Sequence, residues 1–448
     1  MGKATGSVNF DGGSDTIRLG PGFDWQSTGR VYIDSGALEI ASNTVFWTET
    51  GSTSSANTWE DTTWDSGVAA DADHEYVVWA MKNDGTGGNQ TRYMRTPAAK
   101  TGTFPGKRLA LEGVGDNLVG LYLKTKDLTI GDLRLGREAH VVFASYNEGQ
   151  VGEQRLSGKI TVVNPAGSKT YIKGTRSTQS RYHNIAADLV GGTNAYIRLM
   201  SYEAHDSDYQ FTGDNSKYLG AIDACWYNAA NAAHANFYGA NTVGGNPTSK
   251  LVNGLVVDHS EIIFNETADI DQPNRGFYAN NTDNYVNVVD GKTVTWAGPL
   301  NFSASDTTLT KTGAGTIVFK GATESAGVLN VSAGKVVLGA NAVQNLLIGT
   351  VADGAAVELA APTVGEDGKV ALQDYLYIPA ASYDTEKSAA ENLAAYAATA
   401  KVTVPSNLGL TGSWAVTYTA EAITSGEDTL GYMIKVSAKK GGFLVIIR

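Results

Sequence analysis

The stretch that decides the fold runs Leu309-Thr-Lys-Thr-Gly-Ala-Gly-Thr-Ile-Val-Phe-Lys-Gly321 and resumes as Leu329-Asn-Val-Ser-Ala-Gly-Lys-Val-Val-Leu338. Short runs of alternating apolar and polar residues are separated by corners that contain glycine. Alternation places every second side chain on one face of a strand, and glycine accommodates the bend. Because no helical segment separates the runs, the pattern predicts stacked β-coils, each of which buries its inward face against its neighbours.

The same spacing recurs near the beginning of the chain, in Val31-Tyr-Ile-Asp-Ser-Gly-Ala-Leu-Glu-Ile40. A second variant, in Val288–Trp296 and Val351–Leu359, places an Asp-Gly pair between two apolar runs. Such a pair suits either the corner of a coil or the turn of a β-hairpin. Both interpretations are open at this point.

Residues 272–339 resemble the autotransporter-associated β-strand repeat of bacterial surface proteins. The phrases Phe211–Ile222 and Arg275–Tyr278 are similar to phrases common in proteins that carry this repeat. The resemblance implies an all-β fold, a right-handed parallel β-helix. It also implies a passenger-type protein that is extracellular or on the bacterial cell surface.

The pattern of short alternating runs gives way near residue 360 to a segment that includes an Ala-rich, helix-like stretch. We therefore expect a parallel β-helix over residues 1–360 and a small C-terminal α+β or β-sandwich module, or a cap, over 361–448. One helix is predicted at about residues 384–400, with Asp384 as its N-cap and an apolar stripe that includes Leu393. Within the coils, Asp223–Ala240 is rich in Ala and Asn and is expected to form a loop or a short helix.

Composition narrows the classes of function. The net charge is −12 and the pI about 5.0, so no Lys/Arg stripe is available to neutralise phosphates, and nucleic acid is not expected as a partner. A single cysteine, Cys225, allows no intrachain disulfide. No apolar run approaches 18 residues and none follows Met1, so neither a membrane span nor a signal peptide is expected in the sequence as given.

Enzymatic motifs have little support. Asn281-Thr282-Asp283 matches one piece of a polygalacturonase-like site, but the sequence has no Asp-Asp pair and no Gly-His-Gly. Glycoside hydrolysis needs two cooperating carboxylates. A lyase-like calcium site would draw on four residues, for which a solvated surface turn is the simpler interpretation: Glu266, Asp269, Asp271 and Arg275. We predict no catalytic residue, cofactor or metal site, and no enzymatic activity.

Aromatic residues offer a binding hypothesis. Five of the eight tryptophans fall within the first eighty residues. Exposed indole rings can stack on sugars, so the possible glycan-facing residues are Trp47, Trp59 and Trp64. The alternative is that these rings cap the coil stack or fill its core.

Self-association is a second hypothesis. A coil stack ends in unpaired N–H and C=O groups, which invite another chain. The predicted association strand near the end of the sequence consists of Phe443, Leu444, Val445, Ile446 and Ile447. It serves either as the last strand of the C-terminal module or as a strand added to a neighbouring subunit to form a fibre. The leading expectation is a non-enzymatic structural or adhesive β-helix; a carbohydrate-active enzyme and a glycan-binding module are the alternatives.

Overall fold

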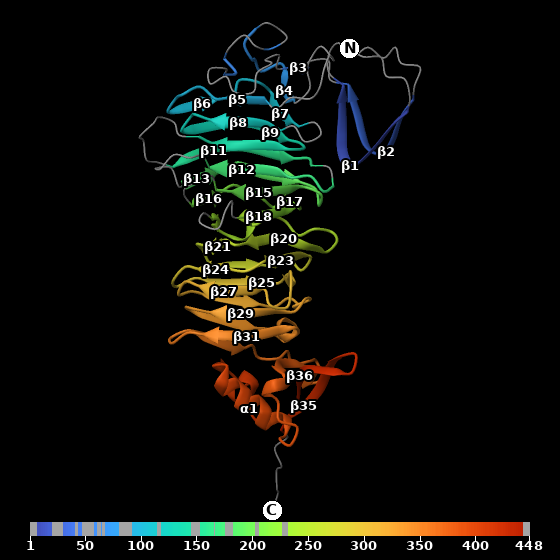
Figure 1. Ribbon diagram of the computed structural model, residues 1–448, viewed down its shortest axis with the longest axis vertical. Coiled ribbons are helices and arrows are strands. Elements are labelled where there is room, and N and C mark those ends of the chain that lie inside the picture. Colours follow the sequence, from blue (N-terminus) through green and yellow to red (C-terminus); the bar gives the residue numbers. More distant parts are fainter. Residues whose placement is uncertain are drawn as a thin grey trace, which may run out of the picture. The chain divides into compact units, whose positions relative to one another are not determined.

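The chain folds as an all-β protein built mainly from parallel sheets (Figure 1). The computed structural model describes residues 7–19, 30–40, 44–46, 58–60, 64, 68–79, 92–113, 118–144, 153–164, 166–174, 182–201, 206–225 and 232–441. It divides into a first unit, Met1–Gly245, and a second unit, Asn246–Arg448. Each unit is described by itself.

Two sheets of parallel strands make up the coils of the first unit. One, called here the ladder sheet, consists in spatial order of β5 (Arg92–Arg95), β8 (Val119–Leu123), β10 (Ala139–Phe143), β12 (Thr170–Gly174), β15 (Tyr196–Met200) and β18 (Ala221–Cys225). The other contains β3 (Thr44–Phe46), β4 (Glu75–Trp79), β7 (Arg108–Glu112), β9 (Asp127–Leu135), β11 (Gln154–Val162), β13 (Tyr182–Ile185), β16 (Ser207–Phe211) and β19 (Ala233–Phe237), with β6 (Thr101–Thr103), β14 (Asp188–Gly191) and β17 (Lys217–Tyr218) beside them.

Two further features complete the first unit. β1 (Ser7–Leu19) and β2 (Arg30–Ile40) form a separate parallel pair, with Val8 opposite Val31 and Leu19 opposite Ile40. The expectation of a loop or helix over Asp223–Ala240 is wrong where the structure describes that segment. β18 continues to Cys225, and β19 is a strand because Ala233, Ala235 and Phe237 alternate toward the core.

The second unit has three parallel sheets. The first holds β20 (Leu251–Asp258), β23 (Arg275–Asn280) and β26 (Leu300–Phe302). The second holds β21 (Glu261–Phe264), β24 (Asn284–Val288), β27 (Thr308–Thr312), β29 (Gly327–Val331) and β31 (Leu346–Val351). The third holds β22 (Ala268–Ile270), β25 (Thr293–Trp296), β28 (Thr316–Phe319), β30 (Lys335–Leu338), β32 (Ala356–Leu359) and β34 (Val402–Thr403).

The chain visits these three sheets in turn, which is the path of a parallel β-helix. From β20 to β28 each coil contributes one strand to every sheet. Ile317 of β28 pairs with Val336 of β30, which pairs with Val357 of β32, so one coil takes about 20 residues here. These three side chains are fully buried, and each stabilises the stack by roughly 1.5–3 kcal/mol.

The corners between the second and third sheets explain the glycine pattern. Gly291, Gly313, Gly334 and Gly354 all have φ between 66° and 82°, a left-handed conformation that glycine adopts without steric cost. The strands on either side of the two Asp-Gly pairs lie in different sheets: β24 and β25 flank one pair, β31 and β32 the other. Both pairs therefore form coil corners, and the β-hairpin alternative is excluded.

The coils are followed by a three-stranded antiparallel sheet and a helix. The sheet has the order β33 (Lys369–Pro379), β36 (Asp428–Lys440), β35 (Trp414–Ser425), and the helix is α1 (Ala389–Thr399). The C-terminal segment is joined to the coils by a strand pairing, because Val402 of β34 pairs with Val357 of β32. The described elements from β33 to β36 belong to the same compact unit as the coils from Asn246 onward.

The helix begins later than the sequence suggested. Its N-cap is Ser388, whose hydroxyl accepts a hydrogen bond from the Glu391 N–H, while the Glu391 carboxylate accepts from the Ser388 N–H. This reciprocal capping box satisfies two backbone donors at once. Asp384, the predicted N-cap, instead accepts from the Glu386 N–H at 3.0 Å, in the turn before the helix.

Candidate functional site: a tyrosine ladder on the first unit

Two rows of residues lie on the face of the ladder sheet opposite its inward row, and several of them are themselves buried: His140, Val142, Asp223 and Cys225. Register partners on successive strands form one row of Tyr93, Gly120, His140, Tyr171, Arg198 and Asp223, and a second row of Arg95, Tyr122, Val142, Lys173, Met200 and Cys225. The row between them points inward and is fully buried: Met94, Leu121, Val141, Ile172, Leu199 and Ala224. Strand alternation therefore fixes which residues face outward. Tyr93, Tyr122 and Tyr171, together with Tyr196, are called here the tyrosine ladder.

The first two rings of the ladder pack on each other. The Tyr93 and Tyr122 ring centroids lie 5.1 Å apart in an edge-on arrangement, and the Arg95 guanidinium lies 5.7 Å from the Tyr122 centroid. Gly120 makes room for this pair, because a Cβ at that position would lie 2.5 Å from the Tyr93 ring. A glycine at this register position lets the aromatic ring cover the strand beside it.

Tyr171 continues the ladder two strands further on. The His140 ring meets it edge-on with centroids 4.6 Å apart, and Lys173 Nζ lies 5.0 Å from its centroid. Burial, with a smaller contribution from Lys173, lowers the pKa of His140 to about 3. His140 is therefore neutral at physiological pH, and Lys173 supplies the positive charge of this step.

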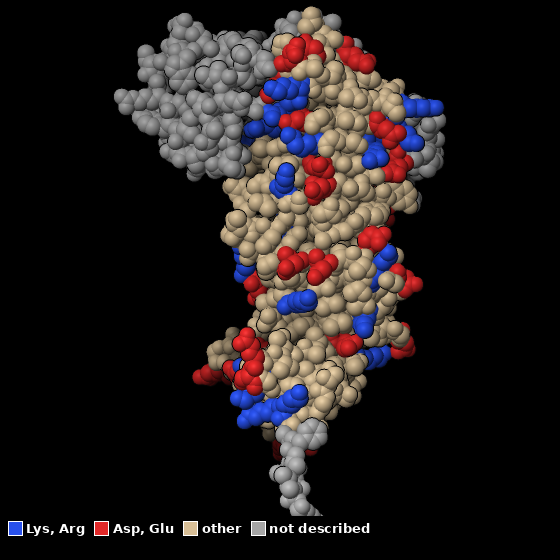
Figure 2. Space-filling view, turned by 180° about the vertical axis from the view of Figure 1, so that it is seen from behind, with Lys and Arg blue, Asp and Glu red and all other residues tan. Residues whose placement is uncertain are grey.

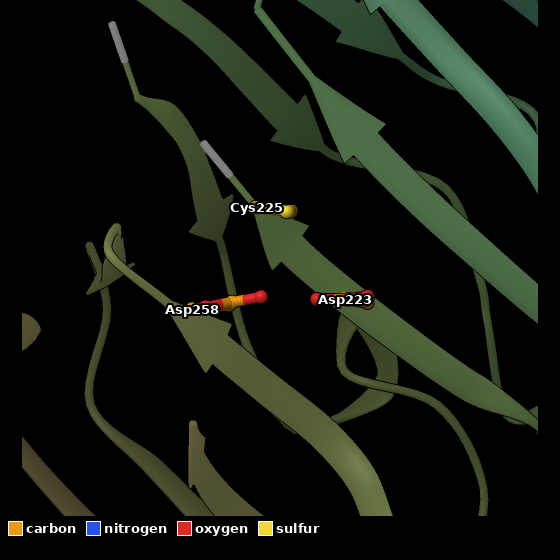
Figure 3. A group of neighbouring side chains, drawn as sticks. All are labelled: Asp223, Cys225 and Asp258. Atoms are coloured by element: carbon orange, nitrogen blue, oxygen red, sulfur yellow. The ribbon is translucent and has the colours of Figure 1, made fainter. Parts of the chain in front are cut away.

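Tyr196 is held by a buried carboxylate. Its hydroxyl donates to Asp223 Oδ2 at 2.7 Å, and Arg198 Nε donates to the same oxygen at 2.6 Å. Asp223 is 0% exposed and projects from β18, as does Cys225 (Figure 3). Burial raises the pKa of Asp223, although Arg198 and Tyr196 oppose the rise. Lys169 Nζ lies 4.9 Å from the Tyr196 ring centroid, so Tyr196, like Tyr122 and Tyr171, has a cation beside its ring.

The ladder combines partial exposure with positive charge. All four tyrosines are half-buried, as are Arg95, Lys169, Lys173 and Arg198. Three of these cations lie against tyrosine faces, where the ring quadrupole attracts them. The arrangement offers π-faces and hydrogen-bond donors in a row that crosses the strands.

Several charged side chains on the other sheet of the first unit form ion pairs. On the other sheet of the first unit, Arg108 lies 2.8 Å from Asp132 and 3.4 Å from Glu75, and Lys159 lies 3.2 Å from Asp132. On the face that Figure 2 shows, positive and negative side chains are interspersed among uncharged residues. The carboxylates Glu75 and Asp132 are therefore both paired with cations.

The tryptophans predicted to face glycans do not do so where the structure describes them. Trp59 is 3% exposed and packs edge-on against Phe104 at 5.2 Å. Trp64 is 2% exposed, packs against Tyr76 at 4.7 Å, and donates its Nε1–H to the Trp59 carbonyl. A buried ring cannot stack on a sugar, so the prediction is corrected for these two. Trp47 lies outside the described residues.

The Asn281-Thr282-Asp283 motif builds a corner in the second unit. Asn281 has a φ of 59°, and its Nδ2 donates to Asp258 Oδ1 at 2.8 Å. Asp258, labelled in Figure 3, is the last residue of β20. Burial favours a raised pKa for Asp258, but hydrogen bonds from Asn281 and His259 outweigh it and lower the pKa. The motif therefore ties one coil to the next.

The residues of the lyase-like cluster differ in their exposure to solvent. Arg275, its only basic member, is 0% exposed and donates from Nη1 to the Gly254 carbonyl at 2.8 Å. At the surface, Glu266 Oε2 forms an ion pair with Lys292 Nζ at 2.7 Å. A buried arginine cannot act on a substrate in solvent, so the structure argues against the calcium-dependent lyase alternative for this set.

The association strand Phe443–Ile447 lies outside the described residues. Among the helices that the structure describes, none combines the length and apolar character needed to cross a membrane. A scan against models of known families, a search of curated proteins and a search of solved structures each found no match.

Proposed function

We propose that this protein is a non-enzymatic, extracellular or cell-surface β-helix that adheres to extended glycans through the tyrosine ladder. The observation that carries the proposal is the placement of four half-buried tyrosines on strands of one sheet, with cations beside them. Tyrosine presents a large apolar face together with a polar tip, which suits sugars because they have both kinds of surface.

The geometry favours a polymer over a small ligand. Neighbouring strands lie about 4.8 Å apart, so β5 to β15, four steps along the sheet, span about 19 Å. A chain laid across the strands would meet Tyr93, Tyr122, Tyr171 and Tyr196 in turn. Lys169 and Lys173 would favour glycans that carry carboxylate or sulfate groups.

Adhesion is favoured over glycan hydrolysis by the state of the ladder's buried carboxylate. Hydrolysis requires one carboxyl group to donate a proton and a second to act as nucleophile or base. Asp223 is bound by both Arg198 and Tyr196, so its Oδ2 is committed to positioning these two side chains. A carboxylate that holds Tyr196 and Arg198 in place fixes the position of the aromatic row, and this arrangement suits binding more than catalysis.

The proposed location rests on the sequence. The resemblance of residues 272–339 to autotransporter-associated repeats supports secretion or surface display. A coil stack stabilised by repeated apolar layers also suits a role in which shape and surface matter more than reactive groups.

The test is binding to immobilised acidic and neutral polysaccharides, measured for the wild-type protein and for Y122A and Y171A. Loss of one stacking ring should weaken binding about tenfold, which corresponds to about 1.4 kcal/mol. The matched control is Y182A, because Tyr182 is a 53% exposed tyrosine on β13, in the other sheet of the same unit. Circular dichroism and thermal melts verify that each variant folds.

Preference for acidic over neutral polysaccharides would support a role for the ladder's cations. Equal binding by wild-type protein, Y122A and Y171A would contradict the proposal, as would equal losses in these variants and in Y182A. Release of reducing ends from the polysaccharide would favour the enzymatic alternative.

A further inference from the structure

Strand β35 lies at one edge of the C-terminal antiparallel sheet. All twelve of its residues, Trp414–Ser425, pair with β36 along one side, and no described strand pairs with the other side. Such an edge presents a row of N–H and C=O groups to which another strand can add. β35 carries one charged residue, Glu421, which forms an ion pair with Lys435 of β36.

The side chains of β35 also leave apolar surface uncovered. Trp414, Val416 and Tyr418 alternate along one face and are only half-buried, and no residue of β35 is buried. On the neighbouring strand, by contrast, Ile434 and Val436 are fully buried. The apolar row of β35 is thus only partly covered by the rest of the described chain.

The sequence that follows β36 has the composition of such a strand. Lys440 pairs with Trp414, and the Gly441 N–H donates to the Ser413 carbonyl at 2.8 Å. The next residues are Gly442 and then five apolar ones, Phe443–Ile447. Aromatic and β-branched residues of this kind favour pleated, buried positions.

Geometry argues against this segment pairing fully with β35 of its own chain. The free edge position lies two strand spacings from β36, about 9.6 Å. Two residues extend at most about 7 Å, so a chain that leaves β36 at Gly441 could bring at most four of the five apolar residues to that position. A second chain faces no such restriction and can offer all five apolar residues.

We propose that Phe443–Ile447 of one copy adds to the free edge of β35 in a second copy. Backbone hydrogen bonds supply affinity, and the half-buried row of Trp414, Val416 and Tyr418 gains a cover. Because donor and acceptor are different surfaces of the chain, the contact is heterologous and each bound copy still offers a free donor and a free acceptor. Assembly is therefore head-to-tail and grows with concentration.

The experiment uses two full-length variants and sedimentation velocity. L444K/I446K disables the donor, and T417K/T419K places lysines on exposed positions of the acceptor edge, where they oppose strand addition. Wild-type protein should form oligomers whose size rises with concentration, whereas each variant alone should be monomeric. An equimolar mixture of the two should yield discrete dimers, since only one donor and one acceptor remain intact.

Thermal melts confirm that both variants are folded. A wild-type protein that is monomeric at high micromolar concentration would overturn the proposal, and so would an oligomer that persists in L444K/I446K. A mixture of the two variants that remains monomeric would show that these two surfaces do not bind each other.

Discussion

We predict that Lys311 makes the stability of the second unit depend on pH. It belongs to the inward row of β27, opposite Val286 and Val331, and is fully buried. Its Nζ donates to the carbonyls of Thr312, Gly313 (2.8 Å) and Ala333 (3.4 Å). Burial lowers the pKa of Lys311 from 10.5 to about 8.

The direction of the pH effect follows from this shift. Below pH 8 the lysine is protonated in both the folded and the unfolded state. Between pH 8 and 10.5 only the unfolded state retains the proton, so the free energy of unfolding rises with pH. One pKa unit corresponds to 1.36 kcal/mol, and the shift therefore predicts a gain of about 3 kcal/mol across this range.

The assay is urea unfolding at pH 7, 8, 9, 10 and 10.5 for the wild-type protein and K311M. Methionine keeps a similar length but cannot titrate, so subtracting its profile removes contributions shared by both proteins, including tyrosine ionisation. The difference should be flat to pH 8 and then rise by about 3 kcal/mol in favour of the wild type. The control K320M replaces an exposed lysine beside the next strand and should leave the profile unchanged.

A difference profile that stays flat to pH 10 would refute the reasoning. It would mean that the three carbonyl acceptors stabilise the ammonium group enough to cancel the cost of burial. The same profile in K320M and K311M would likewise show that Lys311 is not the source.

Three other predictions concern stability. In urea unfolding, G334A should lower the free energy of unfolding by at least about 1 kcal/mol more than G291A does. Both glycines have positive φ, but of the two only Gly334 would place a Cβ against another atom, 2.3 Å from the Gly315 carbonyl oxygen. Equal losses in the two variants would contradict this. S388A should lower stability by about 1 kcal/mol, and no loss would argue against the capping box. Burial lowers the pKa of His183 to about 3, so stability should fall by about 1.4 kcal/mol per unit as pH drops from 6.5 toward 3, and H183L should lose this dependence in acid titrations.

The coil architecture was predictable because its signal is local. Alternation in Leu309–Gly321 places residues inward and outward within a single strand, and glycine marks each corner. The assignment of strands to three sheets was not predictable, because alternation is the same in every sheet. The Asp-Gly pairs showed this, since the same two residues suit a corner or a hairpin.

The tyrosine ladder was not predicted because it depends on register between coils. Tyr93, Tyr122 and Tyr171 are far apart in sequence and meet only when each coil has its particular length. The clustering of tryptophans in sequence was a misleading guide, because composition does not distinguish a stacking platform from a core residue. Trp59 and Trp64 fill the interior instead.

The helix start could have been placed correctly from the sequence. Ser388 is followed three residues later by Glu391, the spacing of a capping box, whereas Asp384 is followed by Lys387. Both Ser and Asp are good N-caps, so the decisive signal was the glutamate that completes the reciprocal pair.

The dependence of affinity on oligosaccharide length tests the central claim most directly. If the four tyrosines bind one extended chain, affinity for an oligosaccharide series of the bound polysaccharide should rise with length until the chain spans about 19 Å, and then level off. In Y171A the rise should stop at a shorter length. Affinity that is already maximal for a monosaccharide, or that does not respond to Y171A, would contradict the account.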